Sequence, residues 1–384
     1  MGRVQDLLGC SYPIFGFGFG SSIDVAIAVS RSGGVGIWGC TRQTPCEIEA
    51  GGSRMKADLG DLPWGVDLVI PAGMPERDDR PAIESTLPPE HVEFVSSMRQ
   101  RYGVPDDGLP GMRSRFVRSE ETARDQLAVA MDHRIPVLAL GVGSPTWAVE
   151  QAHDQGSLIV SLVGRPAHAE TAIRAGADIL VAQGTDSGGH TGPIGTFTLV
   201  PLVVEVAGGR PVLAAGGVAT GRHIAAAMAL GADGVWVGPA FLASVEAAPS
   251  QVLLDKLLAA DASDTVISRS VSGKTLRMLR SAWSDEWSAA GAPEPLKMPH
   301  QDILIGDLLG QVMRHEVVPL VHEGAGQGVA HLVGQETVAE IMDGLVGEAE
   351  GVLAALGVGS SQSGQTGAMR RCSCRWRTGW HRSP

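Results

Sequence analysis

The sequence predicts an α/β fold: a (β/α)8 TIM barrel with a smaller additional helical domain or lid. Short apolar runs of strand length alternate with amphipathic stretches of helical length, which is typical of parallel βα units. Eight such runs occur in the first 245 residues, and right-handed crossovers between them favour closure into a barrel. The chain of 384 residues is long enough for a barrel and a second unit. An open doubly wound sheet is the alternative, although it rarely needs eight units.

An insertion interrupts the alternation after the third strand. The elements expected before it are strands at 12–15, 35–38 and 64–70 and a helix at 23–30. The segment 71–118 then holds seven prolines and many charged residues, with a helix expected at about 88–101 because proline suits a first helical turn. This insertion follows the C-terminal end of a strand, where a lid or a pocket wall would lie. The alternative is a solvent-exposed segment without a role.

The alternation resumes after the insertion. The elements expected there are helices at 120–133, 146–154, 167–175, 198–207 and 221–230, strands at 136–140, 158–162, 178–182, 211–215 and 234–237, and later helices at 251–260 and 336–356. Residues 1–245 therefore form the predicted barrel, with the insertion 71–118, and residues 246–356 form a C-terminal helical segment that packs on it. Residues 357–384 are Ser/Gly-rich and then Arg-rich, and we expect a disordered basic tail.

Composition and charge narrow the function classes. Hydrophobic residues make up 44% of the chain and charged residues 19%, as in a globular protein with a sizeable core. The net charge of −12 argues against a nucleic-acid partner. The five cysteines show no zinc-site spacing, so we expect no metal, and reduced thiols in a cytoplasmic protein. We expect no membrane association, because no apolar run is long enough to span a bilayer and the N-terminus lacks a signal-peptide core.

A glycine-rich loop follows the sixth predicted strand. The stretch 179–190 reads I-L-V-A-Q-G-T-D-S-G-G-H, so an apolar strand ends at Gln183 in a loop that contains Gly188, Gly189 and His190. In parallel α/β proteins the C-terminal ends of strands bind ligands, and glycine lets the backbone approach a ligand closely. His190 is therefore a titratable side chain at a position where chemistry is expected. The alternative is a tight turn with a solvated imidazole.

Two further glycine loops follow the seventh and eighth predicted strands. They contain the pairs Gly216-Gly217 and Gly238-Pro239. In TIM barrels these two loops often bind a phosphate through backbone N–H groups, and two ordinary turns are the alternative. Together with the loop of the sixth strand and the glycine-rich first strand, these loops predict a binding site for a flat phosphorylated cofactor. Flavin mononucleotide (FMN) is such a cofactor.

If FMN binds at this site, several residues would contact its ring system. Gly16 and Gly18 would let the first strand pass under the ring, and Gln183 would hydrogen-bond the pyrimidine edge. His190 would lie over the reactive part of the ring, at the substrate.

At these motifs the sequence resembles a known family. The stretches A-Q-G-T-D-S-G-G-H-T-G at 182–192, A-A-G-G-V-A at 214–219 and G-A-D-G-V-W-V-G-P-A-F at 231–241 are similar to those of the nitronate monooxygenases, formerly called 2-nitropropane dioxygenases. The flavin-dependent enoyl-acyl-carrier-protein reductases share these motifs. The resemblance covers about residues 5–345 and implies an FMN-bearing barrel with a smaller added domain.

The resemblance also implies roles for individual residues. The residues that would hold FMN are Gln183, Gly188, Gly189, Gly216, Gly217 and Gly238. Gln327 matches a late glycine-rich pattern of the family and would face the flavin, with a plain loop as the alternative. His190 would be the base that abstracts the α-proton of a nitroalkane, with a useful pKa near neutrality. It would only position a nitronate, which is already an anion.

The chain departs from the usual family pattern at three places. Asp186-Ser187 stands where Glu-Ala is common, and Pro239 stands where a threonine is usual. Asp67 stands where many relatives have asparagine, and a carboxylate near the flavin would disfavour an anionic substrate. Both Asp67 and Pro239 remain among the expected cofactor contacts.

The expected function is therefore that of an FMN-dependent nitronate monooxygenase. Such an enzyme carries out oxidative denitrification of alkyl nitronates or nitroalkanes with O2, here with His190 as base. One alternative is an NAD(P)H oxidoreductase of the enoyl-acyl-carrier-protein reductase type, and another is a flavin-binding barrel without catalysis. The expected partners are the small-molecule substrate and O2, and a homodimer is left open.

Overall fold

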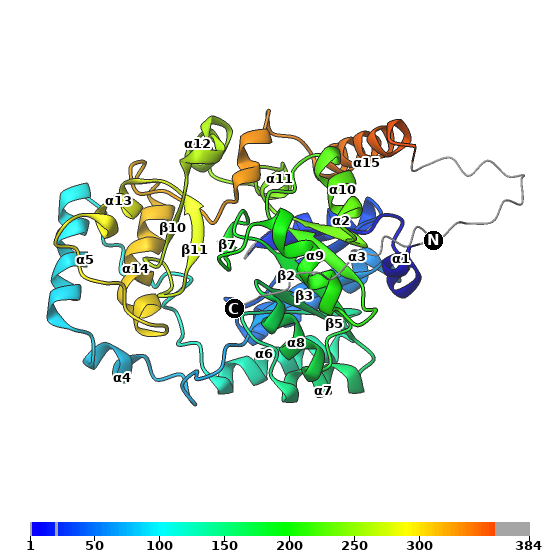
Figure 1. Cartoon of the computed structure of the whole chain (residues 1–384). Helices are drawn as coiled ribbons and strands as arrows, with labels where there is room; N and C mark the ends of the chain where they lie inside the picture. The colour runs from blue at the N-terminus through cyan, green and yellow to red at the C-terminus, as the bar shows by residue number, and fades with distance from the viewer. Residues whose placement is uncertain (1, 20–21, 358–384) are drawn as a thin grey trace, which may run out of the picture.

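The computed structural model describes residues 2–19 and 22–357 of the chain. The described part forms two units, a barrel and a smaller unit beside it (Figure 1). All but the first residue of the expected disordered tail, 357–384, lies outside the described residues. No helix of the described part is long and apolar enough to cross a membrane.

Eight parallel strands form a closed barrel, which confirms the predicted fold class. They are β1 (Ile14–Phe19), β2 (Val35–Gly39), β3 (Trp64–Val69), β4 (Val137–Gly141), β5 (Leu158–Val163), β6 (Ile179–Gln183), β8 (Val212–Ala215) and β9 (Gly234–Val237). They pair in this order, and Ile14 of β1 pairs with Val235 of β9 to close the ring. The first strand runs further than expected, through Phe19, so the glycines of that stretch lie within a strand.

Alternate residues of the strands face inward and fill the barrel. Phe15 stacks on Trp236 with ring centroids 5.8 Å apart, and Ile37, Val160 and Val181 belong to the same fully buried cluster. Branched and aromatic side chains of this kind make the interior a packed core rather than a pore. Any ligand must therefore bind above the packed layers, at an end of the barrel.

The outer faces of the strands pack against helices. These are α2 (Ile23–Arg31), α3 (Pro45–Leu59), α6 (Glu120–Asp132), α7 (Thr146–Asp154), α8 (Pro166–Ala175), α9 (Thr196–Val206) and α10 (Gly221–Ala229), with short α1 (Arg3–Leu8) and α11 (Pro239–Leu242) at the ends of the barrel segment. Helix α15 (Val338–Ala355) returns to the barrel and packs against α10 and α2. The Glu348 carboxylate of α15 accepts a hydrogen bond of 2.7 Å from the Gly221 N–H at the start of α10. This hydrogen bond holds α15 against α10.

The smaller unit has a hydrophobic core of its own. We call it the cap, and define it as residues 71–118 and 243–332. Its helices are α4 (Arg80–Ser85), α5 (Pro89–Tyr102), α12 (Gln251–Ala259), α13 (Ala282–Ser288) and α14 (His300–Arg314), with 3-10 turns η1 (Ala262–Asp264) and η2 (Gln327–His331). Val95 and Met98 of the insertion belong to the same buried cluster as Trp283 and Leu308. The insertion is therefore a wall of the cap.

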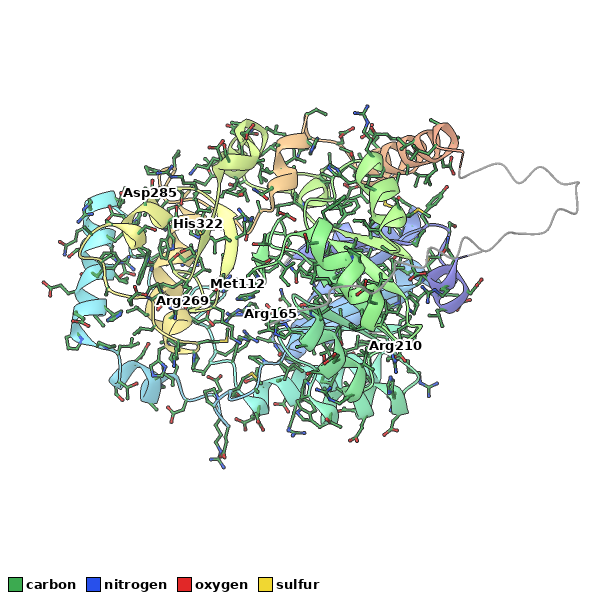
Figure 2. All side chains as sticks on the ribbon, in the orientation of Figure 1. Met112, Arg165, Arg210, Arg269, Asp285 and His322 are labelled. Carbon is green, nitrogen blue, oxygen red and sulfur yellow. The ribbon has the colours of Figure 1, made fainter. Side chains whose placement is uncertain are left out.

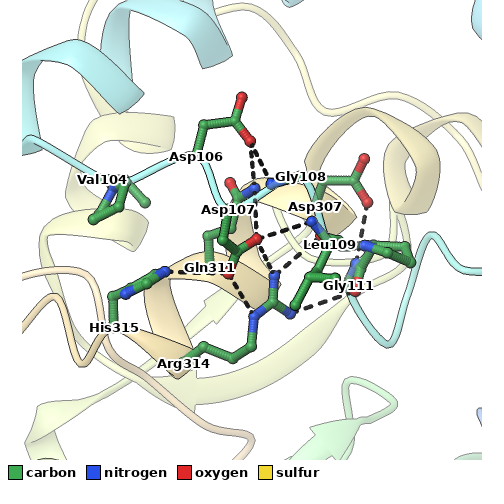
Figure 3. Close-up of polar contacts among 12 residues, drawn as sticks. Val104, Asp106, Asp107, Gly108, Leu109, Gly111, Asp307, Gln311, Arg314 and His315 are labelled. Carbon is green, nitrogen blue, oxygen red and sulfur yellow. Dashed lines mark hydrogen bonds and ion pairs between the residues drawn. The ribbon is translucent and has the colours of Figure 1, made fainter.

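Polar contacts also fix the insertion to α14 (Figure 3). The Arg314 guanidinium donates two hydrogen bonds of 2.8 Å to the two carboxylate oxygens of Asp107, and the His315 Nε2 lies 3.1 Å from the same carboxylate. The Gln311 amide donates to Asp106 at 2.9 Å. The hydrogen bonds from Arg314 outweigh the effect of burial and hold the pKa of the Asp107 carboxyl well below its ordinary value. The planar fork of arginine suits this two-point contact.

A small antiparallel sheet joins the two units. Strands β10 (Thr265–Ser268) and β11 (Leu276–Leu279) form a hairpin of the cap, and β7 (Gly189–His190) adds the loop after β6 as a third strand. His190 pairs with Leu276 and Gly189 with Arg277. In the view of Figure 2, Met112 of the insertion and Arg165 at the start of α8 lie between the ribbons of the two units. The cap therefore sits against the barrel at the loop that follows β6.

Candidate active site

The loop after β6 is held in one shape by hydrogen bonds. The Gly184 N–H donates to the Ala215 carbonyl at 2.9 Å, which ties the loop to β8. The Ser187 hydroxyl donates back to the Gly184 carbonyl at 2.8 Å. The Asp186 carboxylate accepts a 2.7 Å hydrogen bond from the Thr196 N–H at the start of α9. Asp186 thus has a structural partner at the place where it departs from the family pattern.

Three glycine-rich loops, far apart in the sequence, come together at this end of the barrel. A Cβ added to Gly216 would lie 3.0 Å from the Ser187 backbone nitrogen, and one added to Gly326 would lie 2.6 Å from the Asp186 carbonyl oxygen. The Gln327 N–H donates to the same carbonyl at 2.9 Å. Since only glycine allows backbones to approach so closely, the loops after β6 and β8 and the loop at 324–328 form one surface.

Several glycines of this surface border open space. Gly189 and Gly217 have φ angles of +75° and +69°, which glycine adopts without strain. A Cβ on Gly189 or Gly238 would meet nothing within 4 Å, and one on Gly217 would meet only the Asp186 Cβ, at 3.5 Å. A concave strip of exposed backbone of this kind fits the phosphate and ribityl chain of a cofactor.

A cavity of about 320 Å³ opens at this strip. Its lining includes Asp186, Gly216, Gly217 and Gln327, together with Val200 of α9 and several residues of α10. Its size is at the lower end of the range for ligand pockets, about 300–1,000 Å³. The cavity brings together three of the predicted cofactor residues, whereas Gln183, His190 and Asp67 are not part of its lining.

The glycines of β1 have a packing role that the sequence analysis did not identify. A Cβ on Gly16 would lie 2.5 Å from a Val29 methyl carbon, and one on Gly18 would lie 2.2 Å from the Ser22 carbonyl oxygen. These glycines therefore face α2 and allow it to pack closely against the strand. Any contact of Gly16 or Gly18 with a cofactor would come from their backbone at the end of β1.

Gln183 and Pro239 lie at the ends of two barrel strands. Gln183 is the last residue of β6, is half-buried, and pairs in the sheet with Ala215. Pro239 is the first residue of the four-residue helix α11, directly after Gly238. No described residue hydrogen-bonds the Gln183 side-chain amide, so this amide is available to a ligand at the barrel end.

His190 lies where the barrel loop meets the cap hairpin. Its Nε2 is 2.8 Å from the Ser272 Oγ, and Ser272 is fully buried in the turn between β10 and β11. Burial, reinforced by the positive charges of Arg113 and Arg118, lowers the pKa of His190 to about 3. The expected pKa near neutrality is therefore wrong, and His190 is neutral at ordinary pH.

Asp67 lies inside the barrel near the end of β3. It is 6% exposed, and no described residue hydrogen-bonds its carboxylate. Burial raises the pKa of Asp67 to about 7, although the positive charge of Arg118 opposes the shift. At neutral pH a large fraction of Asp67 is therefore protonated and uncharged. In this form its charge is the same as that of the asparagine that the resemblance leads us to expect at this position.

A cluster of basic side chains faces His190, and the sequence analysis did not identify it. Arg42 follows β2, Arg113 and Arg118 end the insertion, and Lys274 lies in the turn between β10 and β11. The positive charges of Arg113, Arg118 and Lys274 all act on His190. The only signal in the sequence was the richness of the insertion in charged residues, which did not distinguish these arginines from surface ones.

One buried carboxylate organises part of this cluster. The Asp302 Oδ1 lies 2.8 Å from the Arg42 guanidinium and 3.3 Å from that of Arg113, and Asp302 is only 2% exposed. Its Oδ2 is buried without a hydrogen-bond partner among the described residues. Burial raises the pKa of Asp302, but Arg42 and Arg113 outweigh that effect and keep it below its ordinary value. Asp302 is therefore an anion.

Comparison with known proteins identifies relatives along nearly the whole chain. A family model described as nitronate monooxygenase matches residues 2–355. Rv1533 of Mycobacterium tuberculosis, which has a provisional monooxygenase name, is 42% identical over 313 residues, covering 79% of this chain and 83% of that protein. A Staphylococcus saprophyticus protein, provisionally named a nitronate monooxygenase, is 28% identical over 295 residues, covering 72% and 77%.

Solved structures agree with this assignment. Nitroalkane oxidase from Streptomyces ansochromogenes aligns with a TM-score of 0.77 at 25% identity, covering 92% of this chain and 99% of that one. FabK from Thermotoga maritima aligns with a TM-score of 0.71 at 27% identity, covering 93% and 98%. The family consists of flavin-dependent oxidoreductases. This chain is therefore an enzyme that belongs to the nitronate monooxygenase family.

Proposed function

We propose that the enzyme is an FMN-dependent nitronate monooxygenase that oxidises alkyl nitronates, and more slowly nitroalkanes, with O2. The observation that carries this proposal is the position of His190 on the same loop as the glycine strip. A side chain able to contact substrate thus lies next to a surface suited to a phosphorylated cofactor. Family membership supports the same reaction.

The residues at this end of the barrel are compatible with FMN. The glycines that would hold its phosphate end are Gly188, Gly189, Gly216, Gly217 and Gly238, and of these Gly189, Gly217 and Gly238 border open space. The rest of the cofactor would contact the other proposed binding residues, which are Gln183, Asp67, Pro239, Gln327, Gly16 and Gly18. Bound FMN would supply the redox chemistry, because it would accept electrons from the nitronate and pass electrons to O2, which no protein side chain does.

The neutral state of His190 favours a nitronate over a nitroalkane. Removing the α-proton of a nitroalkane would turn His190 into an imidazolium beside Arg113 and Arg118, and their positive charges disfavour that product. A nitronate has already lost this proton. For a nitronate, His190 would only have to donate or accept a hydrogen bond and hold the reacting carbon in place.

Anaerobic mixing tests the proposal directly. The purified protein should be yellow, release FMN on denaturation, and lose its flavin absorbance when mixed with ethyl nitronate. Readmitted O2 should restore the absorbance and yield nitrite and acetaldehyde. A protein that cannot be loaded with FMN, or a loaded protein that ethyl nitronate does not bleach, would refute the proposal.

The similarity to FabK supports one competing function. FabK aligns over 93% of this chain, so an NAD(P)H-dependent reductase acting on an enoyl thioester is the second candidate. Rapid anaerobic bleaching by NADPH without bleaching by ethyl nitronate would establish it. Failure of both reagents to bleach bound flavin would favour the third reading, a flavin-binding barrel without catalysis.

A further inference from the structure

The cavity at the glycine strip has more walls than the proposed cofactor residues. Its lining includes Ala214 of β8, which belongs to the same buried cluster as Val200 of α9 and Ala227 of α10. The residues that fill the barrel interior form a different cluster. This part of the cavity therefore lies outside the barrel wall, between α9 and α10. The residues proposed to meet the flavin ring, such as Gln183 and Asp67, do not line it.

The walls of this part of the cavity are apolar. Ala214 of β8 and Ala226 of α10 have no side-chain atom beyond Cβ, which leaves space between the two helices. Val200 of α9 and Leu230, directly after α10, complete the apolar walls. Phe197 of α9 also lines the cavity and is 74% exposed, so its ring offers further apolar surface to a ligand.

Two histidines line the same cavity. His223 lies in the first turn of α10 and His331 ends η2, with their ring centroids 5.0 Å apart. The His223 Nδ1 lies 2.9 Å from the Thr220 Oγ1, and no described residue hydrogen-bonds its Nε2 or the ring of His331. Burial, and then the positive charge of His331, lower the pKa of His223, although Glu348 opposes the shift. An anionic group near both rings would offset their repulsion.

The acidic side chains near the two histidines already have other partners. The Asp186 carboxylate, which also lines the cavity, accepts the 2.7 Å hydrogen bond from the Thr196 N–H. One oxygen of Glu348 accepts from the Gly221 N–H at 2.7 Å, and the other lies 3.0 Å from the Arg222 Nε. The imidazole nitrogens without a described partner therefore remain available to an anionic ligand.

We propose that the cavity between α9 and α10 is a second ligand site, which binds a small carboxylate with an apolar chain. The chain would lie against Val200, Ala226 and Leu230, and the carboxylate would accept hydrogen bonds from His223 and His331. Apolar walls with a few convergent polar groups are the usual composition of a ligand pocket, and a volume of about 320 Å³ suits a small ligand. The site goes beyond the proposed function and does not depend on it.

Calorimetric titration of the FMN-loaded enzyme with octanoate and with 1-octanol tests this proposal. The two molecules have the same chain length, and only octanoate is charged. We expect saturable octanoate binding with a Kd of about 1 mM or lower. Binding of 1-octanol should be about tenfold weaker, because it lacks hydrogen bonds to a charged group. Octanoate should bind more tightly at about pH 6 than at about pH 8.5, since protonated imidazoles attract a carboxylate.

Variants of the two histidines test the polar end of the site. His223→Gln and His331→Gln should each lower the octanoate affinity about 3- to 10-fold, as for partly exposed hydrogen bonds to a charged group, and leave that of 1-octanol nearly unchanged. His168→Gln is the matched control, because His168 is exposed on α8 and lies outside the cavity. Equal affinities for octanoate and 1-octanol in the wild-type enzyme would show that the histidines bind no carboxylate, and the proposal would be wrong.

Filling the cavity tests its apolar end. Ala226→Leu extends a side chain into the cavity from an exposed position of α10, and should weaken both ligands at least about tenfold. Ala229→Leu, at an exposed position of the same helix that does not line the cavity, should leave both affinities unchanged. Octanoate binding that survives Ala226→Leu would place the ligand elsewhere and overturn the proposal.

Competition with the cofactor separates this site from the proposed function. If FMN displaces octanoate from the cofactor-free protein and riboflavin does not, then the two histidines bind the cofactor phosphate and there is no second site. Octanoate binding that follows the variants above, in a protein that cannot be loaded with FMN, would overturn the proposed function and leave the second site standing.

Discussion

The Ser272 hydroxyl lies 2.8 Å from the Nε2 of His190, and it joins the cap hairpin to the one titratable side chain on the loop's short strand β7. Ser272 is fully buried, so its hydroxyl has no competing water. This hydrogen bond fixes the orientation of the imidazole.

Removing the Ser272 hydroxyl should therefore affect the reaction more than the fold. We expect Ser272→Ala to lower kcat/KM for ethyl nitronate about 3- to 10-fold, the effect of one neutral hydrogen bond, with unchanged FMN content. Steady-state nitrite release measures the change. Ser288→Ala, which removes a hydroxyl that bonds only to its own helix, is the matched control. Equal losses in the two variants would show that the Ser272 contact has no role in positioning His190.

His190 itself should matter differently for the two forms of substrate. His190→Asn should lower the turnover of nitroethane at least about 100-fold, because proton abstraction needs a base. Turnover of ethyl nitronate should fall less than about tenfold, since that substrate needs no deprotonation. Oxygen consumption with each substrate measures both values. A similar loss on both substrates would contradict the role of His190 as a base.

The pH profile of the nitronate reaction is an independent check on His190. Burial and the neighbouring arginines lower the pKa of His190 to about 3, so its protonation does not change between pH 5 and 9. We expect no inflection near pH 6.5, the ordinary value for histidine, in the rate for ethyl nitronate. An inflection there that disappears in His190→Asn would show that His190 titrates near neutrality.

Asp67 should make the stability of the cofactor-free protein depend on pH. Burial raises the pKa of Asp67 to about 7. The stabilisation from its protonated form is therefore present in full below about pH 4, the value for an unfolded aspartate, and is lost progressively until pH 7. Urea unfolding should show Asp67→Asn gaining stability relative to wild type between pH 4 and 7, by at most about 4 kcal/mol. A pH-independent difference would contradict this prediction.

Gly217 should be needed for the cofactor rather than for the barrel. Its φ of +69° strains any other residue, and a Cβ would project toward the open side of the glycine strip. We expect Gly217→Ala to weaken FMN binding at least about tenfold, measured by fluorescence titration of the cofactor-free protein. Gly208→Ala has the same kind of strain, with φ +60°, in the turn after α9, and should leave FMN affinity unchanged. Equal FMN affinity in both variants would mean that the strip does not bind FMN.

The barrel was predictable because its signals are local. Eight apolar runs separated by helical stretches gave strands within a few residues of their observed bounds, and parallel strands place their C-terminal loops at one end. The convergence of the loops at Gly188 and Gly216 follows from that topology alone. Helix α3 was missed although its start is readable, since Thr44 and Glu47 form a capping box with Pro45 between them.

The cap was less predictable because it depends on contacts between distant segments. Strand β7 is two residues long and exists only because the cap hairpin pairs with it. Arg113 and Arg118 look like surface charges until the insertion packs against α14. The glycines of β1 were assigned to the cofactor because sequence alone does not show which face of a strand a missing side chain would occupy; Gly16 is required by Val29 of α2.

The pairing of His190 with Leu276 has a consequence for how the enzyme can be divided. His190, the proposed substrate contact, belongs by sequence to the barrel and by backbone pairing to the cap hairpin. Removal of the cap would leave the eight strands of the barrel in place. It would also remove β11, with which the loop after β6 pairs. Chimaeras that exchange caps between relatives should therefore carry β7 along with the hairpin it joins.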